Sequence, residues 1–147
     1  MKTYKIYLFL IFFLKVIQTQ AQKEEITQVN YGTSFGMCEG YCFNETKYTQ
    51  KYVITCSKAW KKGNATEQKD KLDTLKNENW AKILAAINLK RFKKLQNVIG
   101  CPDCNDGGQE WIEITTKRKA YKVTIEYNAD TDFECLKNIL IKRLLNI

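Results

Sequence analysis

The chain of 147 residues contains no histidine. Histidine is the commonest general base near neutral pH and the commonest metal-ligating side chain in proteins. Its absence excludes Ser-His-Asp and Cys-His catalysis, so an enzyme with this sequence would have to work with carboxylates, a lysine or a thiolate. The sequence therefore favours a binding or structural role, without a cofactor, over an enzymatic one.

Long apolar runs are also missing. The run Ile6–Leu14 has nine apolar residues, whereas a membrane-spanning helix needs about 20. Two lysines precede this run, and Thr19-Gln20-Ala21 follows it with a small residue at the end, which is typical of a cleavable secretory signal. We expect residues 1–21 to be a signal peptide and the mature chain, with no transmembrane span, to begin at Gln22.

The remaining residues, 22–147, are enough for a single domain. Residues 1–21 carry three lysines and no acidic residue, so the formal charge of +8 for the whole chain falls to +5 without them, a mild excess. The basic clusters are short: Lys61-Lys62, Lys90–Lys94 and Lys117–Lys119. We interpret these clusters as solvated faces. A nucleic-acid surface would carry more charge with interleaved aromatic residues, so the expected partner is a protein or a cell-surface ligand.

Alternating residues rich in Val, Ile, Thr and Tyr predict five strands. These are Ile26–Tyr31, Phe43–Tyr48, Tyr52–Ser57, Gln109–Thr116 and Ala120–Tyr127, the last two forming a hairpin. The polar segment Lys61–Asp73 predicts a surface loop.

Two apolar stripes predict helices. Trp80, Ile83, Leu84 and Ile87 have helical spacing from about residue 78, and Phe133, Leu136, Leu140 and Leu144 follow a Thr131-x-x-Glu134 capping box. We expect Leu136 and Leu140 to pack in the core against the Ala120–Tyr127 strand. The order of the elements predicts an α+β domain, a mainly antiparallel sheet of about five strands with two main helices packed on one face.

Six cysteines in an exported chain of this size favour disulfides. The close spacings of Cys38 with Cys42 and of Cys101 with Cys104 make two local bridges plausible. Cys56 and Cys135 would then pair with each other or stay reduced.

The Cys101-Pro-Asp-Cys104 motif has a sharper alternative, a redox-active dithiol. Such motifs usually begin a helix, whereas this one precedes Gly107-Gly108 and a strand. Thioredoxin-like sites also place a cis-proline beside the dithiol, and Pro102, inside the motif, is the chain's single proline. The motif is therefore a weak indication of thiol-disulfide oxidoreductase activity.

Metal binding is a further alternative for the cysteine-rich segments. Cys38, Cys42, Cys101 and Cys104 resemble the spacing of a structural zinc site, although an oxidising compartment opposes free thiolates. Oxygen ligands for calcium are present at Asp103, Asn105, Asp106 and Glu110, but their spacing departs from the EF-hand loop.

Two longer motifs stand out in the sequence, YGTSFGMCEGYC at residues 31–42 and GCPDCNDGGQEWIEI at residues 100–114. They resemble a family of short exported proteins of unknown function from Gram-negative bacteria. The resemblance implies a periplasmic or extracellular location and brings no activity, cofactor or catalytic residue.

The glycine-rich and cysteine-rich segments are more elaborate than simple connections require, and loops on a rigid scaffold often carry function. We therefore predict a non-catalytic binding module in which both loops lie close together and form one surface, with Trp111 buried. Candidate surface residues are Phe35, Tyr41, Asp103, Asp106 and Trp111.

Overall fold

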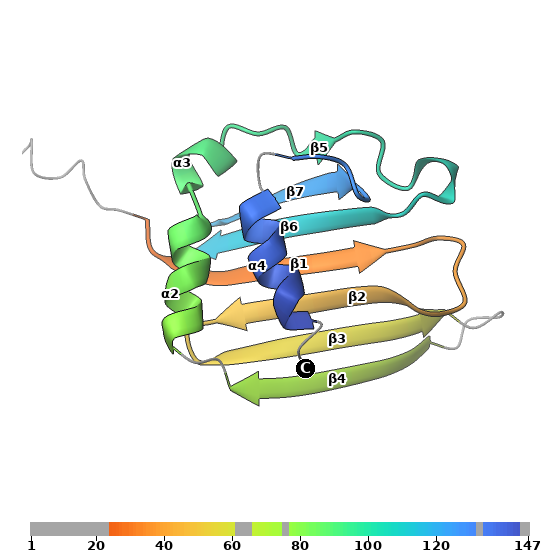
Figure 1. Cartoon of the computed structure of the whole chain (residues 1–147), viewed down its shortest axis with the longest axis horizontal. Helices are drawn as coiled ribbons and strands as arrows, with labels where there is room; N and C mark the ends of the chain where they lie inside the picture. Colours follow the sequence, from red (N-terminus) through yellow and green to blue (C-terminus); the bar gives the residue numbers. More distant parts are fainter. Residues whose placement is uncertain (1–23, 61–65, 75–76, 132–133, 145–147) are drawn as a thin grey trace, which may run out of the picture.

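A computed structural model describes residues 24–60, 66–74, 77–131 and 134–144. These residues form one seven-stranded sheet with the order β4-β3-β2-β1-β6-β7-β5 (Figure 1). Its neighbouring strands are antiparallel except for β5 and β7, which are parallel. The strands are β1 Ile26–Ser34, β2 Gly40–Thr49, β3 Tyr52–Trp60, β4 Thr66–Thr74, β5 Val98–Ile99, β6 Gln109–Thr116 and β7 Ala120–Glu126.

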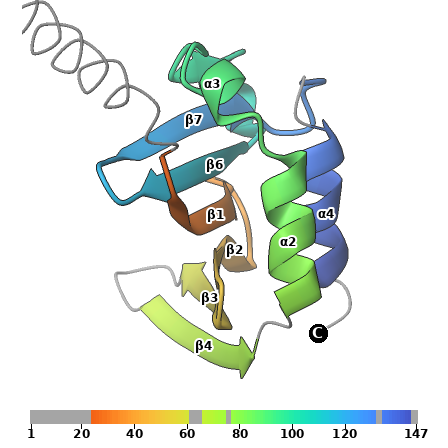
Figure 2. The ribbon, with the colours of Figure 1, turned by 90° about the vertical axis from the view of Figure 1, so that its left-hand side faces the viewer.

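The helices within the described ranges are short. They are α2 Asn77–Ala86, α3 Leu89–Phe92 and α4 Glu134–Leu144, with a 3₁₀ turn, η2, at Cys104–Asp106. Figure 2 shows α2 and α4 side by side on one side of the sheet, and the two helices are in contact. Asn88 caps α3, because its side-chain oxygen accepts a hydrogen bond from the Arg91 backbone at 3.0 Å.

The predicted fold class is wrong. In place of about five strands with two main helices on one face, the described residues form a mixed seven-stranded sheet with only small helices. Most of the difference comes from β4, whose residues were expected to lie in a surface loop. This segment is charged and lacks apolar alternation, and it becomes a strand because all nine of its residues pair with β3.

The core lies on the sheet face covered by the helices. Alternate residues of the central strands point into it, and the helices contribute the opposite wall. The fully buried members are Val29, Tyr48, Ile83, Ile112, Ile114, Ile125 and Leu140. Each side chain of this size contributes about 1.5–3 kcal/mol when it leaves water.

Residues of both helical stripes are buried in this core as predicted, whereas packing of α4 against the Ala120–Tyr127 strand stays a prediction. Trp80 and Ile83 of α2 are buried, as are Leu136 and Leu140 of α4. The backbone carbonyl of Leu140 also accepts a 2.7 Å hydrogen bond from the Tyr48 hydroxyl of β2. A hydrogen bond therefore joins α4 to the sheet in addition to the packing of its apolar side chains. Phe133 and the side chain of Leu144 lie outside the described residues.

The predicted signal peptide, residues 1–21, and the expected new N-terminus at Gln22 also lie outside the described residues. Within the described part of the chain, none of the helices has the length and apolar character that crossing a membrane requires.

Candidate functional site

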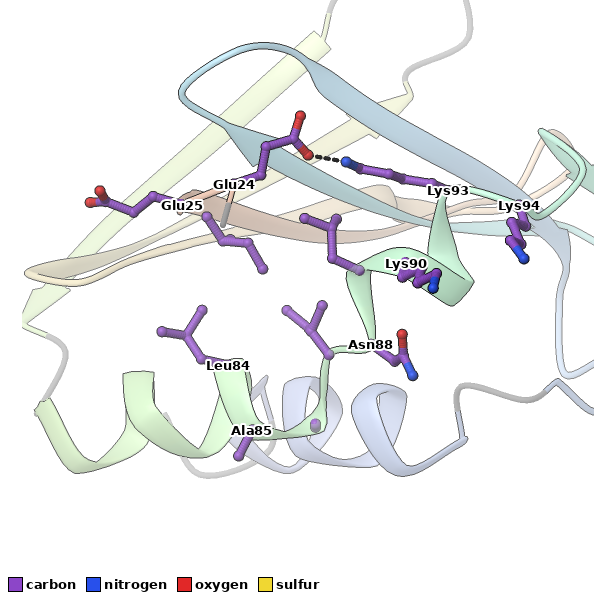
Figure 3. A pocket seen from close by; sticks show the side chains of 12 residues that line it. Glu24, Glu25, Leu84, Ala85, Asn88, Lys90, Lys93 and Lys94 are labelled. Atoms are coloured by element: carbon purple, nitrogen blue, oxygen red, sulfur yellow. Dashed lines mark hydrogen bonds and ion pairs between the residues drawn. The ribbon is translucent and has the colours of Figure 1, made fainter. Parts of the chain in front are cut away.

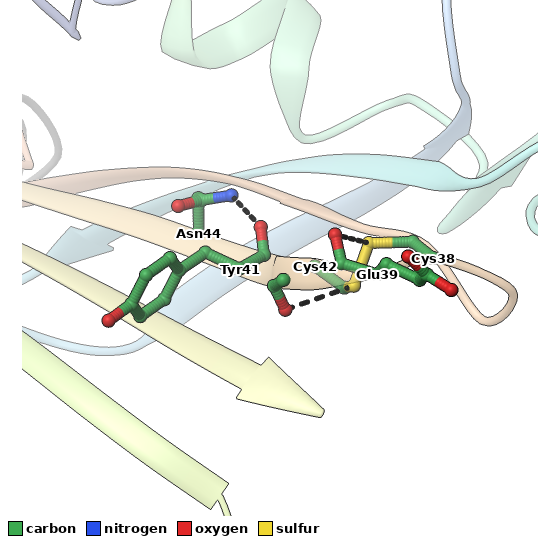
Figure 4. Close-up of a disulfide and its surroundings, with 6 residues drawn as sticks. Cys38, Glu39, Tyr41, Cys42 and Asn44 are labelled. Carbon is green, nitrogen blue, oxygen red and sulfur yellow. Dashed lines mark hydrogen bonds between the residues drawn. A yellow bond between two sulfur atoms is a disulfide. The ribbon is translucent and has the colours of Figure 1, made fainter. Parts of the chain in front are cut away.

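The first cysteine loop joins β1 to β2 and is closed by a disulfide between Cys38 and Cys42, whose Cα atoms are 5.8 Å apart (Figure 4). Cys42 is fully buried. The backbone amide of Phe35 donates a 3.1 Å hydrogen bond to the Cys42 carbonyl, and Asn44 donates one of 3.1 Å to the Tyr41 carbonyl. Met37 projects from this braced loop with 77% of its surface exposed.

The second cysteine loop precedes β6 and is closed by the disulfide between Cys101 and Cys104, with Cα atoms 5.5 Å apart. Asp103, Asn105 and Asp106 all have positive φ angles, which Asn and Asp tolerate better than most residues. The Asp103 amide donates to the Gly108 carbonyl at 3.0 Å, and the Gly107 amide donates to the Cys104 carbonyl at 3.0 Å. The loop is therefore folded by its own backbone hydrogen bonds as well as by the disulfide.

The two loops meet at one end of the sheet, where β1 ends and β6 begins (Figure 1). The Phe35 ring lies directly against Gly108, leaving no room for a Cβ atom there. A Cβ atom on Gly36 would lie 3.3 Å from a carboxylate oxygen of Asp103. Phe35 also packs edge-on against Tyr127, with ring centroids 4.7 Å apart. The structure thus brings the loops together, as the sequence predicted.

The candidate surface residues do not all reach this surface. Asp103 and Asp106 are exposed on the second loop, and Phe35 is half-buried between the loops. Tyr41 is directed toward β4 instead, where its hydroxyl donates to Glu67 at 2.8 Å and the Lys69 ammonium lies 4.6 Å from its ring centroid. Tyr41 therefore faces the edge strand β4 and not the second cysteine loop.

Trp111 is buried, with 5% of its surface exposed, as predicted. It lies against Gly32 on the neighbouring strand β1 and beside Phe43, at a ring centroid distance of 5.4 Å. Its side chain is thus engaged with the sheet rather than filling the contact between the loops. The buried indole packs against the neighbouring strands, and little of its surface is accessible to a partner.

The cysteine pairing leaves two thiols free, Cys56 and Cys135. Burial, followed by the hydrogen bond with Asp70, raises the pKa of Cys56, so this thiol on β3 is not activated. Cys135 is exposed on α4. Cysteines bound in disulfides are not thiolate ligands, and the described residues contain no cluster of three or more Cys, Asp or Glu side chains suited to a metal ion.

The surroundings of Cys101 and Cys104 do not favour redox chemistry. Both residues are exposed, but the element that begins at the end of the motif, with Cys104, is only a three-residue 3₁₀ turn. The Glu126 carboxylate accepts a 3.0 Å hydrogen bond from the Cys101 amide, and Asp103 and Asp106 add two more negative charges to the loop. Negative charges oppose formation of the thiolate that disulfide exchange requires.

A buried polar network, missed in the sequence, lies beneath this end of the sheet. Glu110 is 1% exposed, and its carboxylate accepts 2.8 Å hydrogen bonds from the Tyr31 hydroxyl and from the Lys137 ammonium. Lys137 also pairs with Glu134 at 3.0 Å. Strand alternation could have predicted the burial of Glu110, because side chains two residues apart in a strand point to the same face and Ile112 and Ile114 lie in the core.

The environment of this network fixes the protonation of its members. Burial, and then the hydrogen bond to Glu110, raises the pKa of Tyr31 far above its ordinary value. Burial acts to lower the pKa of Lys137, but its hydrogen bonds to Glu110 and Glu134 outweigh that effect and raise it. Tyr31 therefore stays neutral and Lys137 charged. Glu110, one of the candidate calcium ligands, uses its carboxylate to bind Tyr31 and Lys137.

No protein-family model matches this chain, and a search of curated proteins found no relative.

Proposed function

We propose that this protein is an exported, non-catalytic binding module whose contact surface is formed jointly by the two cysteine loops. The observation that carries the proposal is the contact of Phe35 with Gly108, supported by that of Gly36 with Asp103. Residues about 70 positions apart are thereby held in one place, and each loop is closed by its own disulfide. A surface that is ordered before binding loses little conformational entropy when a partner docks.

The exposed groups of this surface indicate the chemistry of the partner. Met37 is a flexible apolar side chain that is 77% exposed, and methionine adapts well to irregular apolar pockets. The second loop adds the exposed carboxylates of Asp103, which lies against the neighbouring Gly36, and Asp106. A protein that offers an apolar pocket with basic residues at its rim fits this arrangement.

Photo-crosslinking in the exporting cell tests this proposal. A photoreactive amino acid replaces Met37, and in a matched variant it replaces Leu72, which is 69% exposed on β4. We expect a discrete protein adduct from position 37 that is absent from position 72 and weakened by the further substitutions Asp103→Asn and Asp106→Asn. Equal adducts from both positions, or none from position 37, would reject the loop surface as the contact site.

The alternative function, thiol-disulfide oxidoreductase activity at Cys101 and Cys104, has one supporting observation, the exposure of both cysteines. The carboxylates around the motif oppose it. An insulin-reduction assay that compares the wild type with Cys101→Ser distinguishes this alternative from the binding module.

A further inference from the structure

A second candidate site lies far from the cysteine loops. An open groove of about 1140 Å³ separates α2 from the start of β1 (Figure 3). The groove adjoins Ile26, at one end of β1, whereas the loops follow Ser34 at the other end, about 25 Å away for a strand of this length. The two sites can therefore be altered independently.

The floor of the groove is apolar. Leu84 projects from α2 toward the strand in Figure 3, and it is joined by Ile26, Ile87 and Leu89. All four side chains are only partly buried and lie against the edge of the hydrophobic core. Together they give the groove an apolar lining that a hydrocarbon chain could cover.

The rim of the groove is positively charged. Its two acidic residues already have cationic partners: Glu24 is bound by Lys93, which lowers the pKa of this carboxyl, and Glu25 pairs with Lys117 at 2.6 Å. Lys90 and Lys94 also line the groove. Both are exposed, and neither has an ion-pair partner within the described residues.

The positive charge continues beyond the groove. An adjoining hollow of about 480 Å³ shares Lys93 with it and is lined further by Lys119 and Lys122, with no acidic residue. Lys93 and Lys119 both lie over the Tyr121 ring, at 4.8 and 4.7 Å from its centroid. Basic residues from two separate parts of the sequence, interpreted above as solvated faces, thus meet at one place.

We propose that this groove binds an anionic amphiphile, with the hydrocarbon chain on Ile26, Leu84 and Ile87 and a carboxylate or phosphate head group at Lys90 and Lys94. Apolar walls with a few polar groups at one side are typical of small-molecule sites. Lys90 and Lys94 complement the negative charge of the head group, and the apolar side chains contact the hydrocarbon chain.

Isothermal titration calorimetry with simple probes tests the proposal. Decanoate and decyl phosphate represent the two head groups, while acetate and inorganic phosphate lack the chain, and decyltrimethylammonium carries the opposite charge. We expect saturable binding of one decanoate or decyl phosphate per protein, and binding at least roughly tenfold weaker for the three other probes. The anionic probe that binds more tightly shows whether the groove prefers a carboxylate or a phosphate head group.

Matched charge reversals locate the binding. Because Lys90 and Lys94 are exposed, the double variant Lys90→Glu/Lys94→Glu should keep its fold, which circular dichroism verifies, and bind decanoate roughly tenfold more weakly. Lys51→Glu/Lys82→Glu makes the same change in net charge at exposed positions outside the groove and should bind like the wild type.

Three results would overturn the proposal. The first is no saturable binding of either anionic amphiphile, and the second is an equal loss of binding in both double variants. The third is binding of an acidic peptide of alternating Asp and Leu in the groove that decanoate does not displace. The last result would assign the groove to a peptide partner. None of these outcomes bears on photo-crosslinking at Met37, so the two proposals can fail separately.

Discussion

Glu110 and Lys137 form an ion pair in the interior, with 2.8 Å between the carboxylate oxygen and the ammonium nitrogen. Their side chains are 1% and 9% exposed. Glu110 lies on β6 directly after the second cysteine loop, and Lys137 lies in the first half of α4. The pair therefore fastens the terminal helix to the sheet close to the candidate binding surface.

Removing one partner of this ion pair should destabilise the folded protein. Lys137→Met leaves the Glu110 carboxylate buried without a cation, and we expect a loss of about 3–5 kcal/mol in the free energy of unfolding. Glu110→Gln/Lys137→Met should be more stable than Lys137→Met, because no uncompensated charge remains. Urea unfolding measures both, with Lys82→Met on the exposed face of α2 as the control. A single variant as stable as this control would contradict the structural role of the pair.

The same network predicts loss of stability in alkaline solution. The pKa values of Tyr31 and Lys137 are raised in the folded state, whereas in the unfolded chain both groups titrate near pH 10. The folded state then binds more protons than the unfolded state above about pH 10, so stability is complete below that pH and falls as the pH rises further.

Urea midpoints at pH 8 and above pH 10 check this expectation. The decrease should be smaller in Tyr31→Phe, which cannot titrate at this position, than in the wild type. A wild-type midpoint that stays constant or rises over this range would be inconsistent with raised pKa values for these two groups.

The contact between the loops can be tested at its glycines. Gly40 and Gly108 both have positive φ angles, but a Cβ atom would meet nothing at Gly40 and would overlap the Phe35 ring at Gly108. Gly40→Ala should cost about 1–2 kcal/mol from backbone strain alone. Gly108→Ala should cost about 1–3 kcal/mol more from overpacking.

A double variant separates these two contributions. In a Phe35→Ala background the overlap is gone, so the additional cost of Gly108→Ala should fall toward that of Gly40→Ala. If Gly108→Ala costs the same with and without the Phe35 ring, the two loops do not pack as described.

The terminal helix offers a test of the core. Leu140 is fully buried, whereas Leu72 on β4 is 69% exposed. We expect Leu140→Ala to lower the free energy of unfolding by about 2–5 kcal/mol and Leu72→Ala to change it by less than about 0.5 kcal/mol. Comparable effects of the two substitutions in urea unfolding would show that α4 does not close the core.

Local patterns predicted several individual elements, although the predicted fold class is wrong. The strands β6 and β7 have nearly the predicted bounds because their alternation is strong, and α2 begins close to the predicted residue. The charged strand β4 could not be predicted, since pairing with β3 rather than any preference of its own residues makes it a strand. The two-residue β5 is likewise set by its parallel pairing with β7.

The candidate site was predictable in part. Cysteine spacing indicated both local disulfides, and glycine content indicated close packing of the loops. The direction of Tyr41 depended on Glu67 in the unpredicted strand. The partnership of Glu110 with Lys137 joins elements that no local pattern connects, so only the folded chain reveals it.

The central claim is that the two cysteine loops form one ordered surface before any partner binds. Backbone ¹⁵N relaxation of the oxidised, unbound protein tests it most directly. We predict order parameters near 0.85, typical of a rigid backbone, for the amides of Gly36, Asp103 and Gly108. Values below about 0.6 at these positions would show two independently mobile loops and contradict the account.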